Sequence, residues 1–152
     1  MTAEVVHPGG RSDGALIARG SLNSGFALFV KDGRLVFDYN DFHRHTRLEA
    51  RTPLTPGNHT IALDVRRNGD GSAEADLSVD GEAVAAGKIP RLLFIISSTG
   101  MDLGRSLSPV TDDYAAPFAY PGRIDRVVFE LPSAAPTRGE VKAHLRAESV
   151  RQ

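Results

Sequence analysis

The feature that most constrains this chain is an Asp-Gly pair, Asp32-Gly33, set between two runs of alternating apolar and polar residues. Asp-Gly favours a tight β-hairpin because a type I′ turn needs positive φ at both central positions. The turn also fixes the register, and it pairs Val30 with Leu35, Leu28 with Phe37 and Phe26 with Tyr39. All six side chains share one face, as expected of an antiparallel sheet that buries that face.

A second unit repeats this pattern. Ile61, Leu63 and Val65 alternate with more polar residues, and Asp80-Gly81 joins an alternating run over residues 72–80 to another over 82–88. This second turn would place Leu77 near Val84. Two Asp-Gly turns with period-2 runs on each side predict β structure.

Further strands are predicted over residues 14–19, 45–51, 92–97 and 122–131, with Val127, Phe129 and Leu131 on one face of the last. Short strands at this spacing are typical of a two-sheet antiparallel sandwich or jelly roll. Residues 106–121 break the pattern and are predicted to form a long surface loop.

Only the C-terminus looks helical. Thr137 and Glu140 have capping-box spacing, and Val141, Leu145 and Val150 form a weak apolar stripe after them. We therefore predict a sandwich domain over residues 1–132, followed by a linker and a short helical tail over residues 133–152.

Composition narrows the function classes. A chain of 152 residues fits one domain, and its formal net charge of -1 offers no basic face for nucleic acid or an anionic membrane. The absence of cysteine excludes disulfides and thiolate chemistry. Residues 1–14 contain no apolar run, so we expect neither a signal peptide nor a membrane anchor there, and localisation stays undetermined.

Two groups of side chains are candidate metal ligands. Asp102, Asp112 and Asp113 lie on or near the long loop and make calcium the one candidate cofactor, although acids on loops are usually just solvated. His43 and His45 would point to the same side of a strand, but no third ligand stands nearby. The alternative for the two imidazoles is a polar turn leading into a strand.

Four aromatic residues are candidates for stacking against a sugar: Phe42, Tyr114, Phe118 and Tyr120. The alternative is that those in the long loop anchor it to the sandwich, which long ordered loops require. No Gly-x-Ser-x-Gly elbow is present, and no strand carries closely spaced acids.

Several longer motifs resemble the C-terminal region of large bacterial arylsulfatases. They cover residues 14–20, 25–40, 54–60, 101–105, 108–118 and 122–131, and the Arg-rich end over residues 140–152 also resembles that region. The resemblance implies a concanavalin A-like jelly-roll module that packs on a sulfatase catalytic domain of the same parent chain. Two departures are Ser106, where the family commonly has an acid, and the segment around His43.

The resemblance brings no catalytic residue with it. Sulfatases need Cys or Ser in a Cys/Ser-x-Pro-x-Arg context, converted to formylglycine, and an acidic metal site, and neither can be placed in this chain. We therefore expect a non-catalytic accessory domain of an arylsulfatase-like sulfuric ester hydrolase. The alternatives are an independent carbohydrate-binding, lectin-like module and a protein-interaction module that docks through its tail.

Overall fold

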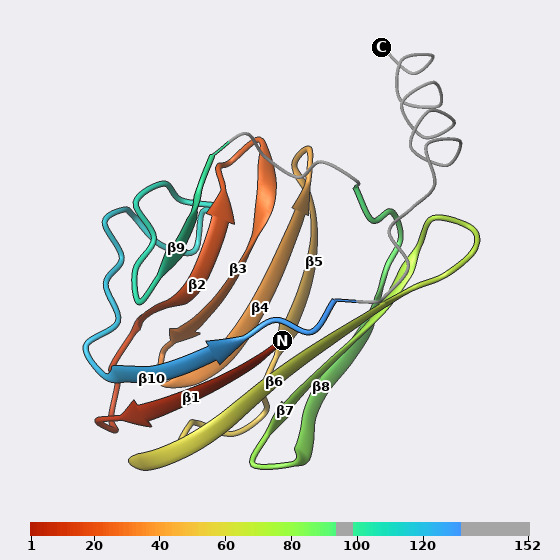
Figure 1. The fold of residues 1–152 in the computed structure, drawn as a ribbon. Coiled ribbons are helices and arrows are strands. Elements are labelled where there is room, and N and C mark those ends of the chain that lie inside the picture. The colour runs from red at the N-terminus through yellow and green to blue at the C-terminus, as the bar shows by residue number, and fades with distance from the viewer. Residues whose placement is uncertain (94–98, 132–152) are drawn as a thin grey trace.

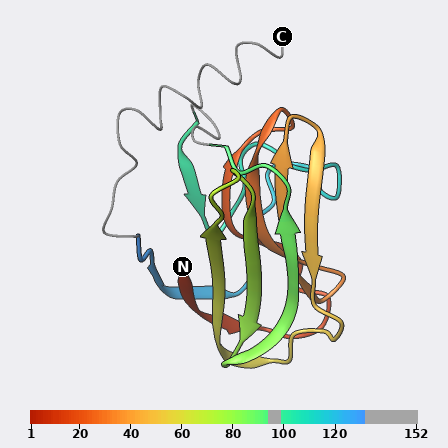
Figure 2. The same cartoon turned by 90° about the vertical axis from the view of Figure 1, so that its right-hand side faces the viewer.

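The computed structural model describes residues 1–93 and 99–131 and folds them into two five-stranded antiparallel sheets (Figure 1). Sheet A has the strand order β10-β1-β6-β7-β8, and sheet B has the order β5-β4-β3-β2-β9. The strands are β1 (Thr2–His7), β2 (Gly14–Gly20), β3 (Ser24–Lys31), β4 (Arg34–Asp41), β5 (Arg44–Glu49), β6 (Gly57–Arg67), β7 (Ala73–Val79), β8 (Glu82–Ile89), β9 (Met101–Leu103) and β10 (Arg123–Val128). Turned by 90°, the molecule shows β8 of sheet A beside β5 of sheet B (Figure 2). The all-β antiparallel sandwich predicted from the sequence is confirmed.

The β3–β4 hairpin has the predicted turn and the predicted register. Asp32 and Gly33 have φ of 51° and 74°, as a type I′ turn requires. The three predicted cross-strand pairs, from Val30 with Leu35 to Phe26 with Tyr39, are all present.

The β7–β8 hairpin has the predicted turn but not the predicted register throughout. Asp80 and Gly81 again take positive φ, of 53° and 84°. A bulge beside Leu77 then adds one residue to β8, so Leu77 pairs with Ala85 and not with Val84. A strict period-2 pattern cannot reveal such an insertion, because both Val84 and Ala85 are apolar and both pack against the core.

The main core lies between the two sheets. Leu28, Leu35 and Phe37 of sheet B meet Ile61 and Leu77 of sheet A there, and all five are at most 2% exposed. Truncating one large buried side chain of this kind costs about 2–5 kcal/mol. These five residues therefore hold the two layers together.

A second apolar cluster covers the opposite face of sheet B. The predicted loop over residues 106–121 contains no strand, and it lies against this outer face beside β2 and β9 (Figure 1). The Tyr114 and Phe118 rings stack with centroids 4.5 Å apart, and both contact the edge or face of Phe29. Sheet B is thus buried on both faces along much of β3 and β4.

The sequence missed strand β1, which pairs with β6 on one side and β10 on the other. Its buried residues, Ala3, Val5 and His7, alternate as a strand requires, but a histidine in the third place hides the pattern. Strand β10 ends at Val128, earlier than predicted.

Two predictions fall outside the described residues. The first is the strand expected over residues 92–97, of which only residues 92 and 93 are described. The second is the tail helix, which falls entirely outside the described residues. Within the described part of the chain, no helix is long and apolar enough to cross a membrane.

His7, at the end of β1, is a buried polar residue that lies beside Tyr120. Its side chain is 1% exposed, and its Nδ1 lies 3.0 Å from the hydroxyl of Tyr120. Burial lowers the pKa of His7 below its usual 6.5, with a smaller contribution from His59. Burial also raises the pKa of Tyr120 to about 12, so its hydroxyl stays neutral.

This burial predicts a pH-dependent stability. Because the folded state lowers the pKa of His7, the unfolded chain binds the proton first, and the free energy of unfolding should fall as pH drops below about 6.5. In His7→Asn, which keeps a polar group near Tyr120, urea denaturation between pH 8 and pH 5 should show a shallower fall. His43→Asn, at an exposed histidine, should keep the wild-type slope, and an unchanged slope in His7→Asn would contradict this account.

Candidate functional site

The strands β4 and β5 are joined by a two-residue turn that contains no glycine. Asp41 pairs with Arg44, and the two residues between them, Phe42 and His43, have φ of 46° and 68°. This is the same left-handed geometry that Asp-Gly supplies in the other two hairpins. A phenylalanine in this region is a conformational outlier that costs about 1–2 kcal/mol.

Asn40 holds this strained turn in place. The side chain is fully buried, and its Oδ1 accepts a hydrogen bond of 2.8 Å from the backbone N–H of His43. Its Nδ2 donates to the carbonyl oxygens of Leu22, at 2.7 Å, and Val110, at 2.9 Å. One amide thus ties together the β2–β3 turn, the β4–β5 turn and the long loop, at one end of sheet B.

The turn presents the ring of Phe42 to solvent, with 57% of the residue exposed. The guanidinium carbon of Arg91 lies 5.8 Å from the ring centroid, within the range of a cation–π contact. Arg91 is itself fixed by two hydrogen bonds to the carboxylate of Asp41, one of them from Nε at 2.8 Å. The aromatic ring, the guanidinium and the carboxylate therefore form one preorganised group, which we call the Phe42 rim: Asp41, Phe42, His43, Arg44 and Arg91.

A small pocket of about 90 Å³ opens at the Phe42 rim. Tyr39, Asp41, Arg44 and Arg91 line it, and the Tyr39 hydroxyl accepts a hydrogen bond of 2.7 Å from the N–H of Leu93. Burial raises the pKa of Tyr39 to about 12, so this group stays a neutral hydroxyl.

The charge of the Phe42 rim is positive. Arg91 is balanced by Asp41, but Arg44 is exposed and takes part in no ion pair within residues 1–93 and 99–131. His43 is exposed beside it. The rim thus combines an exposed aromatic face with an excess of cations.

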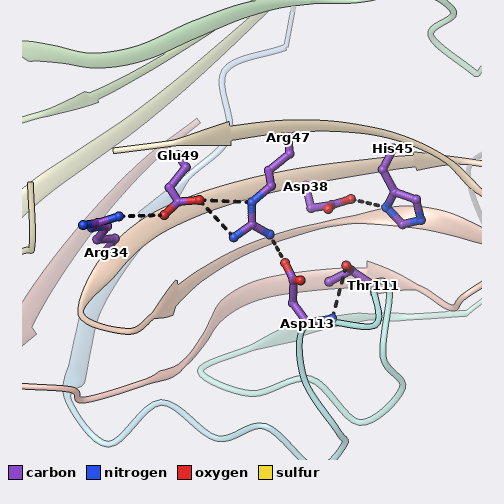
Figure 3. Close-up of polar contacts among 7 residues, drawn as sticks. All are labelled: Arg34, Asp38, His45, Arg47, Glu49, Thr111 and Asp113. Atoms are coloured by element: carbon purple, nitrogen blue, oxygen red, sulfur yellow. Dashed lines mark hydrogen bonds and ion pairs between the residues drawn. The ribbon is translucent and has the colours of Figure 1, made fainter. Parts of the chain in front are cut away.

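The outer face of sheet B carries a polar chain next to this rim (Figure 3). His45 Nδ1 lies 2.7 Å from Oδ1 of the buried Asp38. Further along β5, Arg47 contacts Glu49 at 3.2 Å and forms an ion pair with Asp113 of the long loop. These contacts clamp the loop onto the sheet.

The three carboxylates predicted as metal ligands have different surroundings. Asp113 pairs with Arg47, Asp102 accepts a 2.9 Å hydrogen bond from the N–H of Leu107, and Asp112 is exposed. Among the residues that the structure describes, no group of three or more His, Asp or Glu is placed to hold a metal ion.

The two histidines proposed as a ligand pair do not share a strand. His43 lies in the β4–β5 turn, while His45 lies in β5 and contacts Asp38. The unexpected turn separates them, and the alternative of a polar turn into a strand describes this segment.

The four aromatic residues predicted to stack against a sugar differ in how exposed they are. Tyr114 and Tyr120 are each 7% exposed and Phe118 is half-buried, so these rings anchor the loop and the adjoining backbone. A ligand-binding role for them stays a prediction. Of the four, Phe42 is the one with an exposed ring.

His59, near the opposite end of β4, links three parts of the backbone through its ring. His59 Nδ1 lies 2.7 Å from Asp80 Oδ2, and its Nε2 lies 2.8 Å from the carbonyl oxygen of Thr55. Both ring nitrogens of His59 are therefore engaged by neighbouring groups. The N–H of Thr60 and His59 together lower the pKa of Asp80.

The comparisons with known proteins support the fold. No protein-family model matches this chain, and no curated protein does. Among solved structures, domains LG4-5 of the mouse laminin alpha1 chain match with a TM-score of 0.59 and 19% sequence identity. The match covers 81% of this chain and 32% of the laminin chain. Such a likeness establishes the jelly-roll sandwich, and at this identity it carries no function.

Relaxing the β4–β5 turn should stabilise the protein, at the cost of the exposed ring of Phe42. Replacing Phe42→Asn together with His43→Gly supplies the residues that a type I′ turn prefers, and it should raise the free energy of unfolding by about 1 kcal/mol after loss of the Arg91 contact. Urea denaturation measures this change. The control Asp32→Asn, in a turn that is already relaxed, should stay within about 0.5 kcal/mol of wild type. A double variant no more stable than wild type would show that the turn is not strained.

Proposed function

We propose that this chain is a non-catalytic recognition module that binds anionic saccharides at the Phe42 rim. The observation that carries the proposal is that the fold maintains an exposed aromatic ring on a strained turn, beside a fixed guanidinium. Strain of this kind is retained where the surroundings impose it, and it concentrates at binding sites. A relaxed Asn-Gly turn would serve the hairpin alone.

The chemistry of the rim suits a sugar. An exposed aromatic ring can stack against the C–H face of a pyranose, while the planar Asp41–Arg91 pair offers fixed hydrogen-bonding groups for hydroxyls. Arg44 favours a sulfate or carboxylate substituent on the same sugar, because it supplies a charge that no described acid neutralises.

A non-catalytic role is supported by what surrounds the rim. In the described part of the chain no group of three or more His, Asp or Glu is placed to hold a metal ion, and His45 and His59 each contact a carboxylate through Nδ1.

The wider setting that we propose is an accessory domain of an arylsulfatase-like sulfuric ester hydrolase. The motifs over residues 101–105 and 108–118, which resemble such enzymes, belong to the segment that supports the rim, because Val110 supplies a carbonyl oxygen that Asn40 binds. A rim for anionic sugars would hold such a hydrolase near sulfated substrate. This setting expects coding sequence upstream that contains Cys/Ser-x-Pro-x-Arg, and a stop codon directly before Met1 would contradict it.

The binding proposal is tested with a sulfated chondroitin hexasaccharide and its desulfated counterpart. Isothermal titration should detect binding of the sulfated sugar, weakening as NaCl rises from 50 to 200 mM. Phe42→Ala should lose about 10-fold or more in affinity, because loss of one stacking contact costs at least about 1.4 kcal/mol. Arg44→Gln should weaken binding of the sulfated sugar by a larger factor than binding of the desulfated one, which keeps its carboxylates but loses its sulfates.

Leu103→Ala is the matched control. Leu103 is 52% exposed and lies on β9, at the edge of sheet B remote from β5. This variant should bind as wild type does. Equal affinity of Phe42→Ala and wild type, or equal losses in Phe42→Ala and Leu103→Ala, would refute the assignment of the site.

A further inference from the structure

A cavity of about 340 Å³ lies at the end of the sandwich opposite the Phe42 rim. It opens beside the first residues of β4, whereas the rim begins at the last residue of that strand. Four segments enclose the cavity: Leu35 of β4, the loop over residues 50–55, His59 of β6, and the β7–β8 hairpin over residues 79–84.

Backbone hydrogen bonds hold these segments in place. The N–H of Ala50 donates to the carbonyl oxygen of Leu35 at 2.9 Å, and the N–H of Leu54 donates to that of Gly33 at 2.8 Å. On the other side, Asp80 accepts a hydrogen bond of 2.8 Å from the N–H of Thr60. The walls are therefore built before any ligand arrives, which lowers the entropic cost of binding.

The inner wall of the cavity is apolar. Leu35 and Leu54 are buried there, and Val79 and Val84 pack against the main core from the other sheet. A short aliphatic chain placed against these four side chains would leave water for an apolar surface, which is favourable.

The mouth of the cavity is acidic. The N–H of Thr60 and the ring of His59 lower the pKa of Asp80, which keeps this carboxylate ionised at neutral pH. Glu82 also lines the cavity, is exposed, and forms no ion pair with any residue in the ranges 1–93 and 99–131. One of the two carboxylates thus lacks a cationic partner.

The nearest cations are directed elsewhere. Arg51 lines a different groove, between β5 and β8, and Arg34 contacts Glu49 at 3.4 Å. Among the residues that the structure describes, no lysine or arginine lines the cavity. Two carboxylates beside low-dielectric walls favour a cationic ligand and disfavour an anionic one.

We propose that this cavity binds a small organic ammonium ion that carries a short aliphatic chain. The chain would lie against Leu54 and Val84, and the ammonium group would pair with the carboxylate of Glu82. Thr52 and Thr55 also line the cavity and carry hydroxyl oxygens that can accept the remaining N–H groups. The volume lies near the lower end for ligand pockets, which run from about 300 to 1,000 Å³, so the ligand is small.

This site is separate from the saccharide site that we propose at the Phe42 rim. The two lie at opposite ends of β4, and they select opposite charges. Either site can therefore fail its test without affecting the other.

The probe is n-pentylammonium chloride, added to the ¹⁵N-labelled chain at constant ionic strength and followed by amide chemical shifts. Shifts should concentrate on residues 54–55 and 79–82. Two probes of matched size, pentan-1-ol and sodium pentanoate, replace the ammonium with a neutral and an anionic group. The alcohol should bind more weakly than the ammonium, and pentanoate more weakly than the alcohol.

Two variants separate the charged contact from the apolar one. Glu82→Gln should raise the dissociation constant of n-pentylammonium about 5-fold, as expected for loss of one partly screened ion pair, and leave that of pentan-1-ol unchanged. Val84→Ser should weaken the ammonium and the alcohol by the same factor, because both place their chain on that wall.

Glu74→Gln is the matched control for charge. Glu74 is exposed on β7 between the buried Ala73 and Ala75, so its side chain points to the outer face of sheet A, away from the cavity. This variant removes the same negative charge and should bind n-pentylammonium as wild type does.

Three results would overturn the proposal. Equal affinities for n-pentylammonium and pentan-1-ol would show that the carboxylates select no charge. Equal losses in Glu82→Gln and Glu74→Gln would reduce the effect to the overall charge of the protein. Amide shifts that spread over the surface, or that are absent while the chain stays folded, would show that the cavity holds no such ligand.

Discussion

The β3–β4 hairpin is apolar on both faces, and the rest of the molecule is arranged to cover it. Leu28 and Phe37 point toward sheet A, while Phe29 and Val36 point the other way. A sheet with one buried face needs one covering layer, but this hairpin needs two. Sheet A provides the first, and the loop over residues 106–121 provides the second.

The second covering layer is also what builds the candidate site. Because the loop lies across sheet B to reach Phe29, the carbonyl of Val110 arrives at the buried amide of Asn40. That amide in turn fixes the turn that exposes Phe42. The geometry of the Phe42 rim therefore depends on how the loop packs against sheet B, and a loop loosened at Tyr114 would disturb both.

Sequence predicts the parts of this fold that are local. Asp32-Gly33 specifies a turn and hence the register of eight residues on each side, because glycine accepts positive φ without cost. The bulge beside Leu77 was out of reach because either register buries an apolar residue. The Phe42 rim could not be predicted for another reason. Nothing in Phe42-His43 indicates a tight turn, and Arg91 and Asp41, which contact each other, are 50 residues apart in the sequence.

The most direct test of the account is where a sulfated saccharide binds. In a titration of the ¹⁵N-labelled chain with the sulfated chondroitin hexasaccharide, backbone amide shifts should concentrate on residues 40–45 and on Arg91, next to the exposed ring. Shifts that concentrate instead on the outward face of sheet A, around Thr60 and Asp76, or no shifts at saturating sugar, would contradict the assignment of the Phe42 rim as the binding site.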